Sequence, residues 1–297
     1  MKPALRQQLM FAILCVVWGR TWIAMKSGTV VVPPGLFSGL RWITAGIVLL
    51  AIVRFQEGRL RLPWGMANRV ILVALLLITS NQFFMLYALR YVGSGLGAVI
   101  NCALTPLSLL GFAVAMRQER ITRRIVAAMA LGVFGILMLF GPAALAGRLD
   151  GLVLLGAIGI ICGTLTYSAG SVLARPLLGT VSPLLLAGVI DLVGGVFLLA
   201  CSLAFEPGSI QALDLRWGWG PWGAWLFLVG PAAIGASTIF LVLVRDWGAT
   251  KAGSFAFVSP IIAVLLGLVI SGEALHPIDA VGMVLMLGGA WVALRQA

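Results

Sequence analysis

The chain has 297 residues, of which 61% are hydrophobic and 10% are charged, and its mean hydropathy is +1.11. Soluble domains carry about 45–50% apolar and about 25% charged residues, so a soluble core of this length could not bury so much apolar surface. The formal net charge of +11 does not indicate nucleic-acid binding, because the basic residues lie mainly in short links between apolar runs. Lipid is therefore the expected solvent for most of the chain.

Ten apolar runs of about 17–25 residues are each long enough to cross about 30 Å of hydrocarbon. They cover about 8–26, 36–54, 69–89, 95–117, 123–140, 152–172, 183–205, 221–244, 250–271 and 277–294. The runs are continuous rather than alternating, which favours helices over barrel strands. The first run is expected to be a retained span, since no cleavage-like site and soluble body follow it. The predicted fold is an all-α membrane protein with ten transmembrane helices.

Basic residues alternate between the two sets of links. The links on one side of the membrane, together with both chain ends, carry 14 lysines and arginines. The links on the other side carry only Lys26, Arg90, Arg148 and Arg216. Because cytoplasmic links are enriched in Lys and Arg, we expect both termini in the cytoplasm and the protein in the inner membrane. The expected partners are the lipid bilayer and a small-molecule substrate, without nucleic acid.

The two halves of the chain repeat one pattern. Proline, glutamate and glycine recur with spacings of 13 and then 16 residues, as Pro106–Glu119–Gly135 and as Pro260–Glu273–Gly289. Gly39 and Gly46 in the second run similarly align with Gly188 and Gly195 in the seventh. Several matches in one order indicate a duplicated unit.

The predicted domains are two five-helix repeats, residues 1–145 and 146–297. An odd number of spans makes the second copy cross the membrane in the opposite sense. Inverted repeats of this kind are a transporter architecture, with the binding site near the midplane where the copies meet. The sequence therefore favours alternating access over a receptor or a scaffold.

The opening of the chain resembles the signature of the EamA family, in the drug/metabolite transporter superfamily. The residues that carry the resemblance are Trp18-Gly19, Thr21-Trp22, Ala24, Lys26, Pro33-Pro34, Leu40-Arg41-Trp42 and Ala45. The ten spans, the duplication and the proline-to-glutamate spacings are also similar to that family. The resemblance implies a ten-helix exporter of amino acids or related metabolites, most like the bacterial aromatic amino-acid exporters. Arg20 departs from the pattern, because the family usually has a small residue after Trp-Gly.

Polar residues within spans are costly and usually face the bundle interior or a wet cavity. Amides and hydroxyls beside aromatic rings would suit an amphipathic zwitterion. The alternative for these residues is interhelical packing, worth about 0.6 kcal/mol for each hydrogen bond, and it is favoured for single Ser and Thr residues. The substrate-binding candidates are Trp18, Thr21, Trp22, Arg41, Asn81, Phe84, Tyr87, Asn101, Thr105, Tyr167, Ser237, Ser254 and Ser259.

Three charges lie within predicted spans: Arg20, Arg41 and Asp191. An unpaired buried charge would cost several kcal/mol, so we expect Asp191 to pair with one of the arginines. The functional alternatives are that Asp191 is a proton-coupling carboxylate or that an arginine binds a substrate carboxylate. Arg20 and Asp191 are accordingly the candidates for coupling or an ion pair.

Pro106 and Pro260 lie mid-span at matching positions. Each removes a backbone hydrogen bond and frees a carbonyl about one turn earlier. The freed carbonyls could bind an ammonium group or allow hinge motion, or the kinks could be static and relieved by the Thr105 or Ser259 hydroxyl.

Catalysis finds little support in the sequence. The single histidine, His276, lies in a link, and no cluster has metal-ligand spacing, so neither a metal nor a cofactor is expected. No long link could hold an ATPase domain, so transport energy must come from a gradient. The competing interpretations are a drug, nucleotide-sugar or lipid-linked-sugar carrier of the same superfamily, and a membrane-embedded enzyme or signalling protein. Gly132, Gly135, Gly288 and Gly289 could pack within the chain or form a dimer face, which leaves homo-oligomerisation open.

Overall fold

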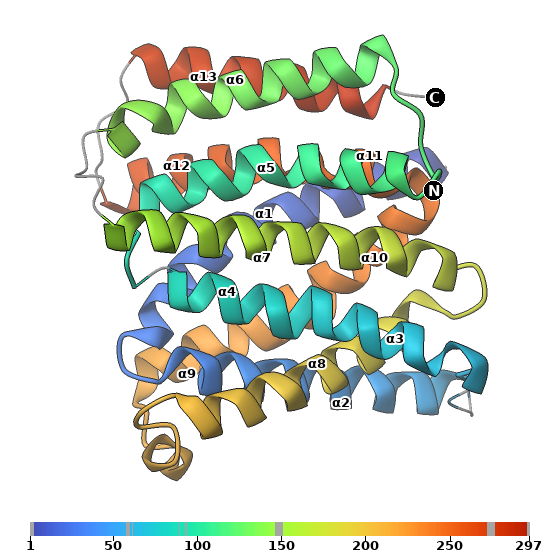
Figure 1. Cartoon of the computed structure of the whole chain (residues 1–297), viewed down its shortest axis with the longest axis vertical. Coiled ribbons are helices and arrows are strands. Elements are labelled where there is room, and N and C mark those ends of the chain that lie inside the picture. Colours follow the sequence, from blue (N-terminus) through green and yellow to red (C-terminus); the bar gives the residue numbers. More distant parts are fainter. Residues whose placement is uncertain are drawn as a thin grey trace.

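The computed structural model describes residues 3–57, 60, 62–88, 90–92, 94–145, 151–271 and 277–295. These residues form ten helical rods that run side by side (Figure 1). The first five rods are α1 (Pro3–Thr29), α2 (Pro34–Glu57), α3–η2–α4 (Ala67–Ala74, Leu75–Ser80 and Asn81–Ala88), α5 (Ser94–Ala115) and α6 (Arg123–Leu145). The other five are α7 (Gly151–Leu177), α8 (Pro183–Phe205), α9–η4–α10 (Trp219–Phe227, Leu228–Ser237 and Thr238–Trp247), α11–α12 (Ala249–Gly253 and Phe255–Ser271) and α13 (Pro277–Leu294). Short 3₁₀ turns, η1 (Trp64–Met66) and η3 (Gln211–Asp214), lie in two of the links.

The rods agree with the predicted membrane spans. Six of the described helical segments are long and apolar enough to cross a membrane by length and composition: 34–56, 67–88, 151–177, 183–205, 219–247 and 277–294. A shorter apolar helix covers Ile100–Ala115. The ninth span, predicted as one run over 250–271, is divided at Ser254 into α11 and α12. The all-α membrane fold is confirmed.

Both ends of the chain lie on one side of the bundle (Figure 1). We call this the terminal side, and the other the opposite side. An even number of crossings brings both ends of the chain to the same side. The links that follow α2, α5, α7 and α10 lie on that terminal side as well.

The two halves pack on each other through equivalent helices. The second rods of the halves, α2 and α8, pack along each other, as do the fifth rods, α6 and α13. In Figure 1 these two pairs lie at the two ends of the bundle's long axis. The first rod α1 packs on α12, and its counterpart α7 packs on α5. Exchanging the halves therefore reproduces the contacts.

Glycines bring the paired helices into backbone contact in a reciprocal way. A Cβ on Gly46 would lie 2.5 Å from the backbone nitrogen of Leu192, and one on Gly195 would lie 2.7 Å from that of Ile43. Because Gly46 and Ile43 have Gly195 and Leu192 as their counterparts, each half makes the same contact with the other. Only a residue without a side chain permits this close approach.

The α6–α13 pair repeats this pattern. A Cβ on Gly135 would lie 2.6 Å from the carbonyl oxygen of Gly282, and one on Gly289 would lie 2.8 Å from that of Ala128. These glycines therefore pack within the chain, as does Gly132, whose Cβ would meet the Phe257 ring. Gly288, in contrast, has no other group within 4 Å of a Cβ position.

A π-helical segment interrupts the third rod of each half, η2 in the first and η4 in the second. Such segments are frequent at functional sites because they change the direction of side chains along a helix. In η4 the Ser237 hydroxyl donates to the Ala232 carbonyl over 3.3 Å, a bond that spans five residues. Both segments lie beside the cavity described below.

The largest apolar cluster fills the terminal half of the bundle. It contains side chains from the terminal ends of most rods, among them Leu14, Leu49, Leu109, Leu186 and Leu243, all of which are fully buried. This packing closes the terminal side and leaves the polar side chains nearer the middle of the bundle.

Candidate functional site: a cavity between the two halves

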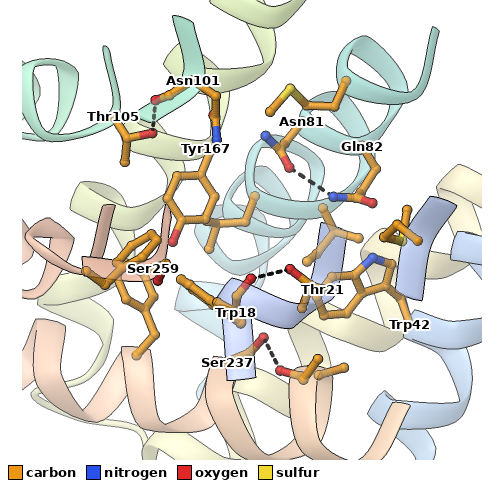
Figure 2. Close-up of a pocket in the computed structure, with 18 of the residues that line it drawn as sticks. Trp18, Thr21, Trp42, Asn81, Gln82, Asn101, Thr105, Tyr167, Ser237 and Ser259 are labelled. Carbon is orange, nitrogen blue, oxygen red and sulfur yellow. Dashed lines mark hydrogen bonds between the residues drawn. The ribbon is translucent and has the colours of Figure 1, made fainter. Parts of the chain in front are cut away.

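A cavity of about 450 Å³ lies between the two halves of the bundle (Figure 2). Eight of the ten rods line it, and no described residue of α6 or α13 does. The polar residues in its lining are Thr21, Arg41, Asn81, Gln82, Asn101, Thr105, Tyr167, Asp191, Ser237 and Ser259, and Trp18 and Trp42 also line it. The rest of the lining is apolar.

The cavity extends from mid-depth towards the opposite side. Arg41 and Trp42 lie about two turns into α2, which begins on the opposite side at Pro34. Asn101 and Thr105 similarly lie about two to three turns into α5, which begins there at Ser94. The apolar cluster of the terminal half lies beneath these residues and separates them from the terminal side.

Four aromatic rings from four different rods form one wall. Trp18 meets Phe255 edge-on, with ring centroids 4.5 Å apart, and lies 5.3 Å from Phe240. Tyr167 stacks on Phe240 at 5.7 Å. Such edge-to-face and stacked pairs give a rigid apolar surface that can bind a planar apolar group. We call these four residues the aromatic wall.

A chain of hydrogen bonds forms a second, polar wall. Arg41 donates from Nη2 to Gln82 Oε1 over 3.3 Å, Gln82 donates from Nε2 to Asn81 Oδ1 over 3.1 Å, and Asn81 donates to the Gly163 carbonyl over 2.9 Å. Figure 2 shows the Asn81–Gln82 bond. The chain connects α2, α4 and α7, so it couples the Arg41 guanidinium to both halves of the protein.

Arg41 and Asp191 face the cavity but do not form the ion pair expected from the sequence. Arg41 is 5% exposed and Asp191 2% exposed, and no nitrogen–oxygen distance of 4.0 Å or less joins them among the ion pairs of the described residues. The guanidinium instead contacts the Met25 sulfur at 3.3 Å and lies 4.4 Å from the centroid of the Trp42 ring. The expectation of a direct pair is therefore wrong, because neutral and aromatic groups surround Arg41.

Arg20, the other intramembrane arginine, lies outside the cavity. It is exposed, and its guanidinium lies over the Phe227 ring, 5.8 Å from the centroid. Next to it, Gly19 lets α1 approach α12, since a Cβ there would lie 2.8 Å from the Ser259 carbonyl oxygen. The Trp-Gly motif therefore brings Trp18 against α12, the helix that carries Pro260.

Several cavity hydroxyls bond to their own helices. Thr21 donates to the Trp18 carbonyl and Thr105 to the Asn101 carbonyl, both over 2.7 Å. The Asn101 side-chain oxygen accepts from Thr164 over 2.9 Å, which fixes α5 against α7. These groups line the cavity and also serve helix packing.

Besides Arg20, four candidates from the sequence are not among the lining residues. Phe84 and Tyr87 lie with Phe83 in a cluster of rings, and the Tyr87 ring also stacks under the Arg90 guanidinium at 4.8 Å. Ser254 is buried and donates to the Lys251 carbonyl over 2.8 Å. Pro106 is buried within α5, whereas Pro260 lines the cavity. The side chain of Trp22 lies outside the described part of the structure, as do the whole of Glu273 and His276.

Gln82, Phe240 and Phe255 are among the lining residues that were not candidates from the sequence. Gln82 follows Asn81 directly in a polar run, and that run was the signal that could have found it. Phe240 and Phe255 are apolar residues in apolar spans, so no pattern distinguishes them from residues that face lipid.

A buried glutamate fixes the opposite-side ends of α2 and α8. Glu206 accepts from the Gly35 backbone nitrogen at 2.9 Å and from the Ser202 hydroxyl at 2.6 Å, and it pairs with Arg90 at 3.1 Å. Glu206 lies in a link and carries no sequence signal. Its contacts hold together the start of α2, the end of α8 and the link after α4, on the side towards which the cavity extends.

On the terminal side, different bonds join the links. Arg175 and Gln118 exchange bonds between the end of α7 and the link after α5, where Arg175 donates to the Gln118 carbonyl and Gln118 donates to the Val172 carbonyl. Glu119 in that link accepts from the backbone nitrogen of Thr250 over 3.3 Å. These bonds close the terminal side above the apolar cluster.

Ten helical rods in two equivalent halves, with a mixed polar and aromatic cavity between them, define a membrane carrier. The model of the EamA-like transporter family matches residues 6–141 and again residues 154–295, so the chain belongs to that family. It is a multi-pass inner-membrane protein and a secondary transporter, not an enzyme.

Relatives of similar length support this assignment. The chain is 31% identical over 269 residues to "Uncharacterized inner membrane transporter YedA" of Escherichia coli, covering 90% of this chain and 83% of YedA. It is 25% identical over 267 residues to "Uncharacterized transporter YoaV" of Bacillus subtilis, covering 88% and 87%. A solved structure titled "Crystal structure of protein" has a TM-score of 0.79 at 23% identity, over 97% of this chain and 96% of that one, which shows a shared fold.

Proposed function

We propose that this transporter exports small amphipathic metabolites, among them amino acids with aromatic side chains, by alternating access. The observation that carries this proposal is the cavity, which has an aromatic wall and a polar wall and includes both Arg41 and Asp191 in its lining. Its volume of about 450 Å³ lies in the range of about 300–1,000 Å³ that small-molecule sites occupy.

The packing of the two halves supports alternating access. Reciprocal glycine contacts give two equivalent copies that can exchange roles at a fixed central site. We assign residues 1–145 and 146–297 to the copies, and Pro106 and Pro260 to equivalent flexible points of α5 and α12. Polar bonds at both sides supply the contacts that would open and close in turn.

We place both termini in the cytoplasm. On the terminal side, the described links and adjoining helix ends carry Arg54, Arg69, Arg117, Arg123, Arg175 and Arg245, whereas those on the opposite side carry Arg90 and Arg216. Since cytoplasmic links are the more basic ones, the cavity extends towards the outer side, as in a carrier that releases its substrate outwards.

The carrier of a nucleotide sugar is the weaker alternative. A diphosphate would need several cationic groups, and Arg41 is the only cationic residue in the lining that the structure describes.

The test is transport by the purified protein in liposomes. Vesicles preloaded with unlabelled phenylalanine, leucine or glutamate are offered the labelled compound, with and without a pH gradient. We expect exchange of phenylalanine and little exchange of glutamate. If no amino acid is exchanged while a drug or a sugar nucleotide is, the substrate class proposed here is wrong.

A further inference from the structure

Two buried groups of opposite charge face one cavity from two tightly packed helices, without pairing. Arg41 lies on α2 and Asp191 on α8; both line the cavity, and no direct ion pair joins them among the described residues. The backbone contact at Gly46 and Gly195 fixes the spacing of these helices. The separation of the two charges is therefore built into the helix pair.

Neither charge is satisfied by its protein neighbours. The Asp191 Oδ2 atom, the Arg41 Nε atom and the Trp42 indole nitrogen are all buried without a hydrogen-bond partner. The two bonds that Arg41 does make go to an amide oxygen and to a sulfur, which carry no charge. Because buried polar groups are nearly always paired, three such atoms on residues that line one cavity indicate a ligand that supplies both an acceptor and a donor.

We propose that Arg41 and Asp191 together bind the zwitterionic end of the substrate. Arg41 binds the carboxylate and Asp191 binds the ammonium group, while the substrate side chain lies against the aromatic wall of Trp18, Tyr167, Phe240 and Phe255. A zwitterion brings one negative and one positive charge, so it compensates both residues and leaves the cavity neutral. The pair is thus the specificity determinant that excludes analogues with only one charge. This inference rests on the proposed export of amino acids.

Competition against labelled phenylalanine exchange in liposomes tests the inference. The competitors are phenylalanine, 3-phenylpropionate, which lacks the ammonium group, and phenethylamine, which lacks the carboxylate. Leaving one buried charge unpaired weakens binding strongly, so we expect each single-charge analogue to compete about 30-fold or more worse than phenylalanine.

Two variants should each remove the discrimination against one of the two analogues. In Asp191→Asn, 3-phenylpropionate should approach phenylalanine as a competitor, while phenethylamine stays poor. In Arg41→Gln, phenethylamine should improve and 3-phenylpropionate should stay poor. The matched controls are Asp214→Asn and Arg216→Gln, which remove exposed charges in the link before α9 and should keep the wild-type order. Ligand-induced thermal stabilisation of each variant in detergent shows whether it folds and binds, even where exchange is too slow to measure.

The outcomes separate the inference from the proposed function. If the wild-type protein exchanges no amino acid, the proposed function fails and the inference fails with it. If phenylalanine is exchanged but each single-charge analogue competes as well as phenylalanine does, the inference alone is overturned. It is also overturned if Asp191→Asn abolishes the response to a pH gradient yet keeps the discrimination against 3-phenylpropionate, because the carboxyl group then carries protons.

Discussion

The helix pairs α2–α8 and α6–α13 cross in the same way and differ in what lies beside the crossing. Both use glycines that contact the backbone of the partner helix, Gly46 and Gly195 in one pair, Gly135 and Gly289 in the other. The α2–α8 pair also lines the cavity, with Arg41, Trp42 and Asp191 among its residues, whereas α6–α13 contributes no described residue to it. The close crossing therefore belongs to the fold, and the chemistry depends on polar residues placed next to it.

Changing a glycine of the α2–α8 pair should have the largest effect, because it alters the fold and the site together. In Gly46→Val, the new side chain would overlap the Leu192 backbone, which lies 2.5 Å from the Cβ position. Overpacking of this kind costs about 1–3 kcal/mol, and shifting α2 against α8 also displaces Arg41 from Asp191. We expect a lower melting temperature in detergent and loss of exchange in liposomes. Gly111→Val is the control, since nothing lies within 4 Å of a Cβ there. Normal exchange by Gly46→Val would show that the crossing does not set the site.

The equivalent change in the α6–α13 pair should lower stability without changing recognition. In Gly135→Val, the side chain would meet the Gly282 carbonyl oxygen, 2.6 Å from the Cβ position, and we expect a destabilisation of similar size. Because α6 and α13 do not line the cavity, protein that remains folded should keep the wild-type KM. Thermal unfolding and concentration-dependent exchange measure the two quantities. Gly288→Val, on an open face of α13, should change neither. A raised KM in Gly135→Val would contradict the division of roles between the pairs.

The sequence predicted the packing better than it predicted the site, for physical reasons. The repeat spacing of Gly39–Gly46 and Gly188–Gly195 indicated the duplicated unit, and the structure shows that Gly46 and Gly195 lie where α2 and α8 come into backbone contact. The span boundaries followed from length and hydropathy, as in α2, expected over 36–54 and observed over 34–57.

The cavity lining was harder to predict, because one chain does not show which face of an apolar helix points inwards. Phe240 and Phe255 have the same chemistry as rings that face lipid, and the π-helical segments that turn Asn81 and Ser237 inwards have no sequence signature. The sequence also could not show that Arg41 and Asp191 form no direct pair, because that outcome depends on which side chains surround each of them. Those neighbours, Met25 and Gln82, come from other rods.

Removing the amide that holds Arg41 should have an intermediate effect. In Gln82→Leu, Arg41 loses its only side-chain oxygen partner among the bonds observed, and the chain to Asn81 is broken. A hydrogen bond to a charged group is worth about 1.5–3 kcal/mol, so the KM for phenylalanine should rise about tenfold or more, with a near-normal melting temperature. Concentration-dependent exchange measures the change. Gln8→Leu, at an exposed position of α1, is the control. An unchanged KM would mean that Gln82 does not position the arginine.

The smallest expected effect concerns the polar bonds that hold α2 and α8 together at the opposite side. Glu206→Gln keeps an oxygen that can accept from the Gly35 nitrogen, but it removes the charge that pairs with Arg90. Because Arg90 is partly exposed and screened by solvent, we expect a loss of about 1 kcal/mol or less. The loss should shrink at high salt, and the KM should stay normal, since Glu206 does not line the cavity. Thermal unfolding at low and high salt measures the charge contribution, and Asp214→Asn, in the neighbouring link, is the control. A large destabilisation that salt leaves unchanged would mean that the bonds to Gly35 and Ser202, rather than the ion pair, hold this end of α2–α8. The α2–α8 pair would then depend on buried polar bonds, unlike the glycine crossing of α6–α13.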